Sequence, residues 1–325
     1  MDNKLDFIKT LEQHLNETLS KTVSQNWQKY LQTLPSLQNV TSWMIFSDYC
    51  IGERMKHNDS ISVVICPTTN IELISNDINK FIPNDIKKIR DIKKETLNYL
   101  KSPYYFSINF VVDSVKYYHK LYIPNNNRAI LSRDVEIMYN SINSVAEKNE
   151  FQKDFQKKIK RLREKIKSKN FSTFNYCKIL LIAFLVAYVA LFITTHIKVK
   201  KLIWFSDRGL VFDFLDGICI NMYQQIYYNL LQETNILIPM PNPFGIARQN
   251  KNEKFLWYDS LIKLPDYYAG AISSWDIKIN QADEDKHVQV IEKVFADNTN
   301  FNLIKINFKD KLFQSEKIEI RKIQQ

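Results

Sequence analysis

One stretch of this sequence restricts the possible folds more than any other. The residues from Ile179 to Ile193 are all apolar, and no charged residue follows until Lys198. A helix that is apolar on every side must be covered, either by the rest of the protein or by lipid. The stretch is shorter than the roughly 20 residues of a membrane span, and Lys200–Phe205 resembles a strand that begins directly afterwards. We therefore expect a buried core helix, with a membrane anchor flanked by basic residues as the alternative.

The remaining pattern alternates between short β-rich runs and helical periodicity, which is typical of an α/β fold. A stripe of apolar residues from Leu5 to Leu31 predicts an N-terminal helix that ends at Pro35. Further helices are expected over Phe214–Leu231 and from Pro265 onward. The predicted strands are Trp43–Phe46, Ile61–Cys66, Tyr105–Val112, Leu202–Phe205 and Lys254–Tyr258.

Composition excludes several common kinds of site. The chain has only 5 glycines, too widely spaced for a dinucleotide-binding or phosphate-binding glycine loop. Its 4 cysteines form no C-x-x-C pair and its 5 histidines no H-x-x-x-H pair, so a zinc site is not indicated and buried free thiols are expected. The first ten residues lack the apolar core of a secretory signal, which favours a cytoplasmic location.

The net charge of +10 favours an anionic partner. Much of this charge lies in a predicted amphipathic helix over Glu147–Lys169. Such a helix can be a solvated surface helix, a phosphate-binding helix or a contact with anionic lipid. The residues predicted to bind nucleic acid are Lys157, Lys158, Lys160, Arg161, Arg163 and, after the fourth strand, Arg208.

Three aspartates stand at the ends of predicted elements. Asp48 ends the first strand, Asp207 follows the fourth, and Asp266 lies in the first turn of the late helix. Carboxylates at neighbouring strand ends can converge although they are far apart in sequence. Hard cations such as Mg²⁺ or Mn²⁺ require such oxygen ligands, and two of them about 4 Å apart support phosphodiester hydrolysis. We therefore predict that these aspartates are the catalytic and metal-binding residues, although each taken singly is also an ordinary cap or turn residue.

The order of these motifs resembles the RNase H-like superfamily, which places one Asp on its first strand, another after its fourth, and a last acidic residue on a late helix. Within it, the chain is most similar to bacterial proteins that carry a D-E-S-G-like motif and an A-D-x-x-A-G motif. The matching stretches are Ser47–Gly52, Ser206–Arg208 and Pro265–Ala271. Glu does not follow Asp48, so Glu53, Asp59, Asp213 and Asp216 are further candidates for a fourth carboxylate.

The resemblance implies an RNase H-like mixed sheet flanked by helices, over residues 37–285, with a basic helical insertion at about 113–175. Residues 1–36 would form an N-terminal helical segment, and residues 286–325 a C-terminal α+β extension. The implied function is a metal-dependent nuclease acting on DNA or RNA, for example in bacterial defence. The alternatives are a non-catalytic nucleic-acid-binding or complex-forming subunit on the same scaffold, and a membrane-anchored effector.

Overall fold

The structure is a computed structural model. It describes residues 12–33, 37, 39–68, 71–207, 209, 214–234, 244–246, 257–309 and 312–322. The chain divides into two compact units, which are described separately below. The sheet unit comprises Met1–Ser114, Phe192–Asp207 and Ile238–Gln325, and the helical unit comprises Val115–Leu191 and Arg208–Leu237.

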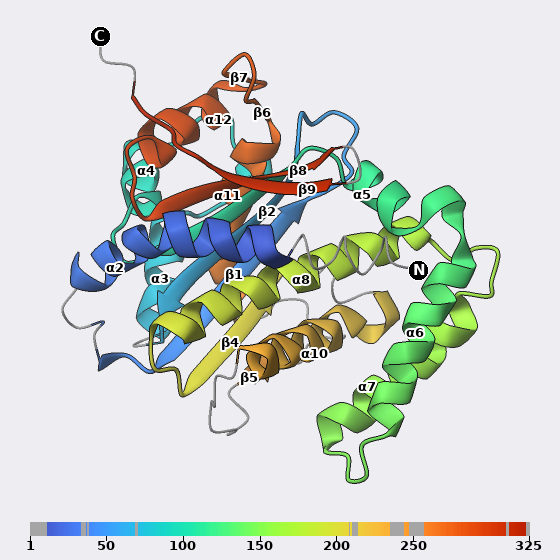
Figure 1. The fold of residues 1–325 in the computed structure, drawn as a ribbon. Coiled ribbons are helices and arrows are strands. Elements are labelled where there is room, and N and C mark those ends of the chain that lie inside the picture. Colours follow the sequence, from blue (N-terminus) through green and yellow to red (C-terminus); the bar gives the residue numbers. More distant parts are fainter. Residues whose placement is uncertain are drawn as a thin grey trace. The chain divides into compact units, whose positions relative to one another are not determined.

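The sheet unit is built on one mixed sheet of seven strands in the order β5-β4-β1-β2-β3-β8-β9 (Figure 1). The first three strands form an antiparallel meander, β4 runs parallel to β1, and β5 runs parallel to β4. The strands are β1 (Ser42–Cys50), β2 (Asp59–Pro67), β3 (Phe106–Val112), β4 (Lys201–Ser206), β5 (Phe244–Ile246), β8 (Phe301–Lys309) and β9 (Leu312–Ile318). The predicted α/β class with a mixed sheet flanked by helices is confirmed.

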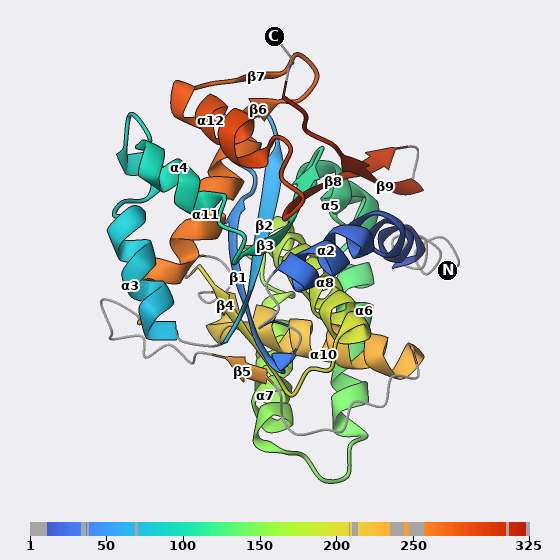
Figure 2. The ribbon, with the colours of Figure 1, turned by 90° about the vertical axis from the view of Figure 1, so that its left-hand side faces the viewer.

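Side chains of successive strand residues point to opposite faces, and both faces of this sheet are covered. Met44 and Phe46 of β1 belong to the core beneath α11 (Asp259–Ser273), α3 (Ile71–Phe81) and α4 (Lys94–Leu100). Trp43 faces the other way, where its ring lies 5.4 Å from that of Trp27 on α2 (Ser24–Thr33). Figure 2 shows α3, α4 and α11 on one side of the sheet and α2 on the other.

The C-terminal part of the chain continues the same sheet. After the two-stranded β6 (Trp275–Asp276) and β7 (Gln281–Ala282) come α12 (Asp285–Val290) and the π-helix η6 (Ile291–Phe295). Strand β8 then pairs parallel with β3, and β9 pairs antiparallel with β8. The stretch 286–325, expected as an extension, thus adds two strands to the central sheet.

The helical unit begins at Val115, near the expected start of the insertion, and also takes in the chain up to Leu191 and the stretch 208–237. Its elements are α5 (Val115–Tyr122), the 3₁₀ turns η4 (Pro124–Asn126) and η5 (Phe214–Asp216), α6 (Arg128–Asn143), α7 (Glu150–Lys165), α10 (Ile218–Glu233) and most of α8 (Thr173–His196). The apolar run lies in α8, the one helix of the described residues long and apolar enough to cross a membrane, and 78% of its most apolar stretch is buried.

Two expected elements lie elsewhere in the structure. The prediction of a strand at Lys254–Tyr258 is wrong for the two of its residues that the structure describes, because Trp257 and Tyr258 form a turn before α11. Residues 254–256 lie outside the described part. Strand β5 instead occupies Phe244–Ile246, directly after the prolines at positions 239, 241 and 243, where no strand was predicted. Only three residues pair with β4, so tertiary pairing rather than a local pattern creates this strand.

Candidate active site

The pairing of β1 with β4 brings Asp48 and Asp207 close together. The parallel register aligns Ser47 with Ser206, and the backbone N–H of Asp207 continues the ladder by donating to the Ser47 carbonyl at 3.1 Å. Asp48 does not end the strand as expected, since β1 continues to Cys50. Asp207 directly follows β4 and is exposed. Two of the three predicted aspartates therefore lie close together, one within β1 and one directly after β4.

Hydrogen bonds on the face of the sheet opposite Asp48 hold β1 and β4 in this register. Trp204 Nε1 donates to Ser47 Oγ at 2.7 Å, and the hydroxyl groups of Tyr49 and Ser206 lie 2.8 Å apart. The hydroxyls of Ser47 and Tyr49 also share a hydrogen bond. A slip of one residue between β1 and β4 would turn Asp48 to the other face of the sheet. This network of hydrogen bonds therefore supports the position of Asp48 beside Asp207.

Helix α11 brings the third aspartate to the same place. Asp266 was expected in the first turn, but α11 begins at Asp259, about two turns earlier. A proline inside a helix costs about 3 kcal/mol, and the buried side chains of Leu261 and Leu264 before Pro265 offset that cost. The carboxyl groups of Asp266 and Asp48 share a hydrogen bond, and Asp266 Oδ2 also accepts the Ile86 N–H at 3.1 Å.

The raised pKa values of Asp48 and Asp266 follow from burial and from repulsion between the acids. Burial raises the pKa of Asp48 well above its ordinary value, and the charges of Asp266 and Asp207 raise it further. Burial also raises the pKa of Asp266, against the hydrogen bonds from Ile86 and Asp48. Two adjacent buried carboxylates repel each other, so this pair favours a shared proton or a bound cation.

A row of small polar residues continues from Asp48 across the sheet. Asp48 aligns with Ser62 of β2, which aligns with Asn109 of β3, so all three side chains share the face that α11 covers. Both Ser62 and Asn109 are fully buried, and neither Ser62 Oγ nor Asn109 Oδ1 has a partner among the described residues. Alternation of apolar residues does not predict this row, and the register alone reveals it.

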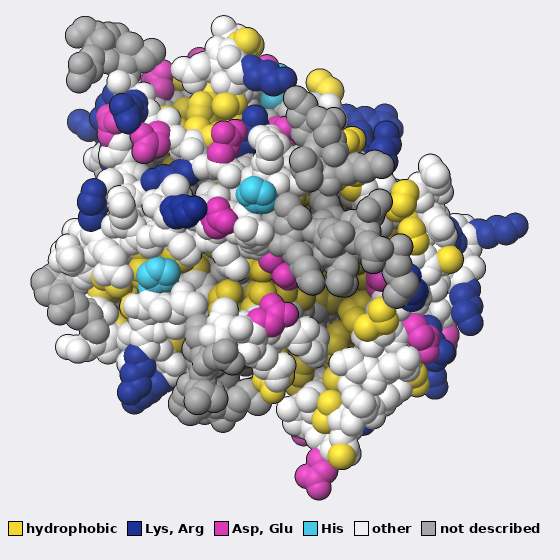
Figure 3. All heavy atoms as spheres, viewed as in Figure 1, with side chains coloured by type: hydrophobic (Ala, Val, Ile, Leu, Met, Phe, Trp, Pro, Cys, Tyr) yellow, Lys and Arg dark blue, Asp and Glu magenta, His cyan; other side chains and the backbone are white. Residues whose placement is uncertain are grey.

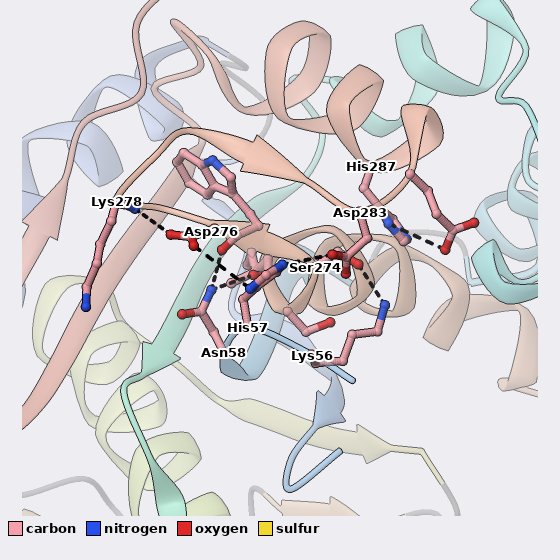
Figure 4. Close-up of polar contacts among 12 residues, drawn as sticks. Lys56, His57, Asn58, Ser274, Asp276, Lys278, Asp283 and His287 are labelled. Carbon is pink, nitrogen blue, oxygen red and sulfur yellow. Dashed lines mark hydrogen bonds and ion pairs between the residues drawn. The ribbon is translucent and has the colours of Figure 1, made fainter. Parts of the chain in front are cut away.

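The Asp48–Asp266 pair lines a cavity of about 280 Å³. The loop between β1 and β2 forms one wall, and it is held because the backbone N–H groups of His57 and Asn58 donate to the Ser273 carbonyl at the end of α11. The charged and imidazole side chains that complete the lining are Glu53, Lys56, Lys87, Glu284, Lys286 and His287. Figure 4 shows part of this wall, with Lys56, His57 and His287 around Ser274 and Asp283.

Lys87 is a site residue that the sequence pattern did not single out. Burial lowers its pKa, but the negative charges of Glu53, Asp266 and Asp48 together hold it above its ordinary value. Its Nζ lies 4.0 Å from Glu53 Oε1. In the sequence Lys87 is one of several lysines in a polar stretch, so only its place in the cavity distinguishes it.

The four residues predicted as candidates for a fourth carboxylate differ in their surroundings. Asp59 accepts the Gly52 N–H at 2.5 Å and anchors the loop. Glu53 lines the cavity. Asp216 belongs to the helical unit, where it pairs with Arg161 at 2.6 Å. Asp213 lies outside the described residues.

The predicted nucleic-acid-binding residues divide into paired and exposed side chains. In α7, Lys158 pairs with Asp154 at 2.8 Å, Arg161 with Asp216, and Arg163 with Glu136 at 2.5 Å. Lys157 and Lys160 are exposed and form no ion pair within the described part of the chain. Arg208 lies outside the described residues.

No three His, Cys, Asp or Glu side chains in the described ranges form a group arranged to hold a metal ion. The four cysteines are free and buried. Comparison with protein-family models, with curated proteins and with solved structures found no match to this chain.

Proposed function

We propose that this protein is a Mg²⁺- or Mn²⁺-dependent phosphodiesterase that cleaves DNA or RNA, built on an RNase H-like scaffold. The observation that carries the proposal is the pair of hydrogen-bonded carboxyl groups of Asp48 and Asp266 in a cavity, with Asp207 close enough to raise the pKa of Asp48. The acids stand on β1, directly after β4, and on the late helix α11. This distribution supports the resemblance to the RNase H-like superfamily.

The donor set fits a hard divalent cation. Asp48 and Asp266 offer only oxygen atoms, and Mg²⁺ is commonly held by one or two carboxylates together with waters and substrate phosphate. The proton that the pair shares is the species a cation would replace, because either one removes the repulsion between the carboxylates. When bound, the cation would polarise the phosphoryl group and lower the pKa of a water molecule.

The protein's own residues would perform three tasks. Asp48 and Asp266 would hold the cation, with Asp207 contributing negative charge from β4. Lys87, which lies among the carboxylates, would neutralise charge on the substrate phosphate. The Ile86 amide would keep the Asp266 carboxylate oriented through its 3.1 Å hydrogen bond.

The decisive variant is Asp48→Asn, which keeps the shape of the side chain and removes its charge. We expect it to lower metal-dependent cleavage of single-stranded and duplex oligonucleotides by roughly a thousandfold, the scale of losing a group that stabilises transition-state charge. Circular dichroism should show an unchanged fold. Asp216→Asn in the helical unit is the matched control, because Asp216 pairs with Arg161 and lies outside the cavity. Equal cleavage by Asp48→Asn and the wild type would refute the proposal.

A second candidate is nucleic-acid binding without cleavage, which the exposed Lys157 and Lys160 on α7 favour. Such a protein would bind oligonucleotides with a steep salt dependence, and added Mg²⁺ or Mn²⁺ would produce no hydrolysis. Turnover that depends on Asp48 would eliminate it.

A further inference from the structure

His287 presents an unusual buried polar group at the cavity wall. Only 3% of the residue is exposed, and its Nδ1 has no hydrogen-bond partner among the described residues. The nearest acid, Glu284, has its Oε1 at 3.9 Å from Nδ1, which is too far for a hydrogen bond. Buried polar atoms are almost always satisfied, and the residue that carries this orphan lines the cavity, so a group that enters the cavity is the candidate partner of His287.

The charges around His287 favour an anion as that partner. Burial lowers the pKa of His287 to about 4, with help from Lys56 and Lys286 and against Glu284 and Asp283. The imidazole is therefore neutral at pH 7 and keeps one N–H to donate. Among these neighbours, Glu284 is engaged by Lys286 at 2.9 Å.

Lys56 is the cation best placed to assist. Its Nζ donates to Ser274 Oγ at 2.7 Å, which leaves two of its three N–H donors for another acceptor (Figure 4). Lys286 is less available, because it donates to the Ile89 carbonyl at 3.0 Å and pairs with Glu284. The lining of the cavity thus includes the acids Asp48 and Asp266 and the donors Lys56 and His287.

We propose that His287 and Lys56 bind a phosphate group of the substrate in the cavity that Asp48 and Asp266 also line. This inference rests on the proposed function and specifies which residues receive the substrate phosphate. A cavity of about 280 Å³ is slightly smaller than typical pockets for drug-sized ligands. It has room for a phosphate group.

The test uses the full-length protein and inorganic phosphate as the probe. Phosphate added at pH 7 should shift the NMR signals of the His287 imidazole and raise the pKa of His287, because an anion stabilises the protonated ring. Phosphate affinity should fall roughly tenfold in His287→Gln and in Lys56→Met, as expected for the loss of a hydrogen bond to a charged group. His57→Gln is the matched control, because His57 is partly exposed and its Nε2 lies 2.8 Å from Asp283.

The outcomes separate this inference from the nuclease proposal. If phosphate leaves the His287 signals unchanged, or if His287→Gln and His57→Gln bind phosphate equally, the assignment of His287 is wrong even when the wild type cleaves nucleic acid. If Mg²⁺ without phosphate shifts the imidazole and phosphate does not, His287 belongs to the cation side and the inference is also wrong. Phosphate binding at His287 without any cleavage would sustain the inference and refute the nuclease. Thermal unfolding of each variant excludes loss of the fold as the cause.

Discussion

The raised pKa values of Asp48 and Asp266 link the site to stability. The folded-state pKa of Asp48 lies well above that of an unfolded aspartate, so the folded protein retains a proton that the unfolded chain releases. Its contribution to stability is therefore fully present below the ordinary pKa of about 4 and is lost as the pH rises through the raised pKa. The same sign holds for Asp266, whose pKa is also raised.

We therefore expect the metal-free protein in EDTA to lose the contribution of Asp48 and Asp266 as the pH rises above about 4. Asp48→Asn should flatten this dependence and raise the unfolding midpoint at pH 8 by a few degrees, since about 1 kcal/mol shifts it by a few degrees in a chain of this size. Mg²⁺ should raise the midpoint of the wild type more than that of the variant. The measurement is thermal unfolding by circular dichroism, and parallel pH curves for the two proteins would contradict the expectation.

At the scale of elements, the approach of α11 to the 3₁₀ turn η3 (Ile86–Lys88) positions the acidic pair. The turn supplies the Ile86 N–H to Asp266 and places Lys87 in the cavity. Gly270 permits this approach, because a Cβ at that position would lie 2.9 Å from Ile86 Cγ2. The close neighbour of this glycine is therefore the turn.

Gly270→Ala tests this contact. In an open helix the change would stabilise by up to about 1 kcal/mol, but here Ile86 must move, so we expect a loss of about 1–3 kcal/mol and weaker metal-dependent cleavage. Adding Ile86→Ala to Gly270→Ala removes the methyl group in the way and should restore part of the activity. The free energy of unfolding from urea titration and the cleavage rate are the measurements. A stabilised Gly270→Ala with full activity would show that the approach is unimportant.

At the scale of the whole molecule, the protein carries a net charge of +10. Figure 3 shows Lys and Arg side chains scattered among acidic and neutral ones on the face it draws, without one continuous basic patch. Several cations of α7 are neutralised within the helical unit. Net charge therefore overstates the number of phosphate contacts that the protein can make.

Lys157 and Lys160 are the α7 cations that we expect to contact phosphate. The double variant Lys157→Gln/Lys160→Gln should reduce the slope of log affinity against log salt by about 2, since each phosphate contact contributes about 0.9 in duplex DNA. Arg163→Gln is the control, since it removes one positive charge, as each of the two lysine changes does. Because Arg163 already pairs with Glu136, this variant should leave the slope unchanged. Fluorescence anisotropy at several salt concentrations measures the slopes. An unchanged slope in the double variant would place the nucleic-acid contact elsewhere.

Much of the fold follows from local patterns in the sequence. The runs at Ile61–Cys66 and Leu202–Phe205 become β2 and β4, and Ile179–Ile193 lies in α8. Such runs are predictable because burial against any neighbour requires the same alternation or continuity of apolar residues. The strand β5 and the helical start at Asp259 were not predictable, because pairing with β4 and burial of Leu261 override the local proline signals.

By itself, the sequence determined which residues could supply oxygen ligands and which classes of site were excluded, because those properties belong to side-chain chemistry. Only the tertiary structure decided that Asp48 and Asp266 share a hydrogen bond, that Lys87 lies among them and that His287 lines the same cavity. The physical reason is that these contacts join β1, the turn η3, α11 and α12, which are separated by long stretches of chain. Strand register and helix packing bring these elements together, and neither is encoded in the spacing of any one motif.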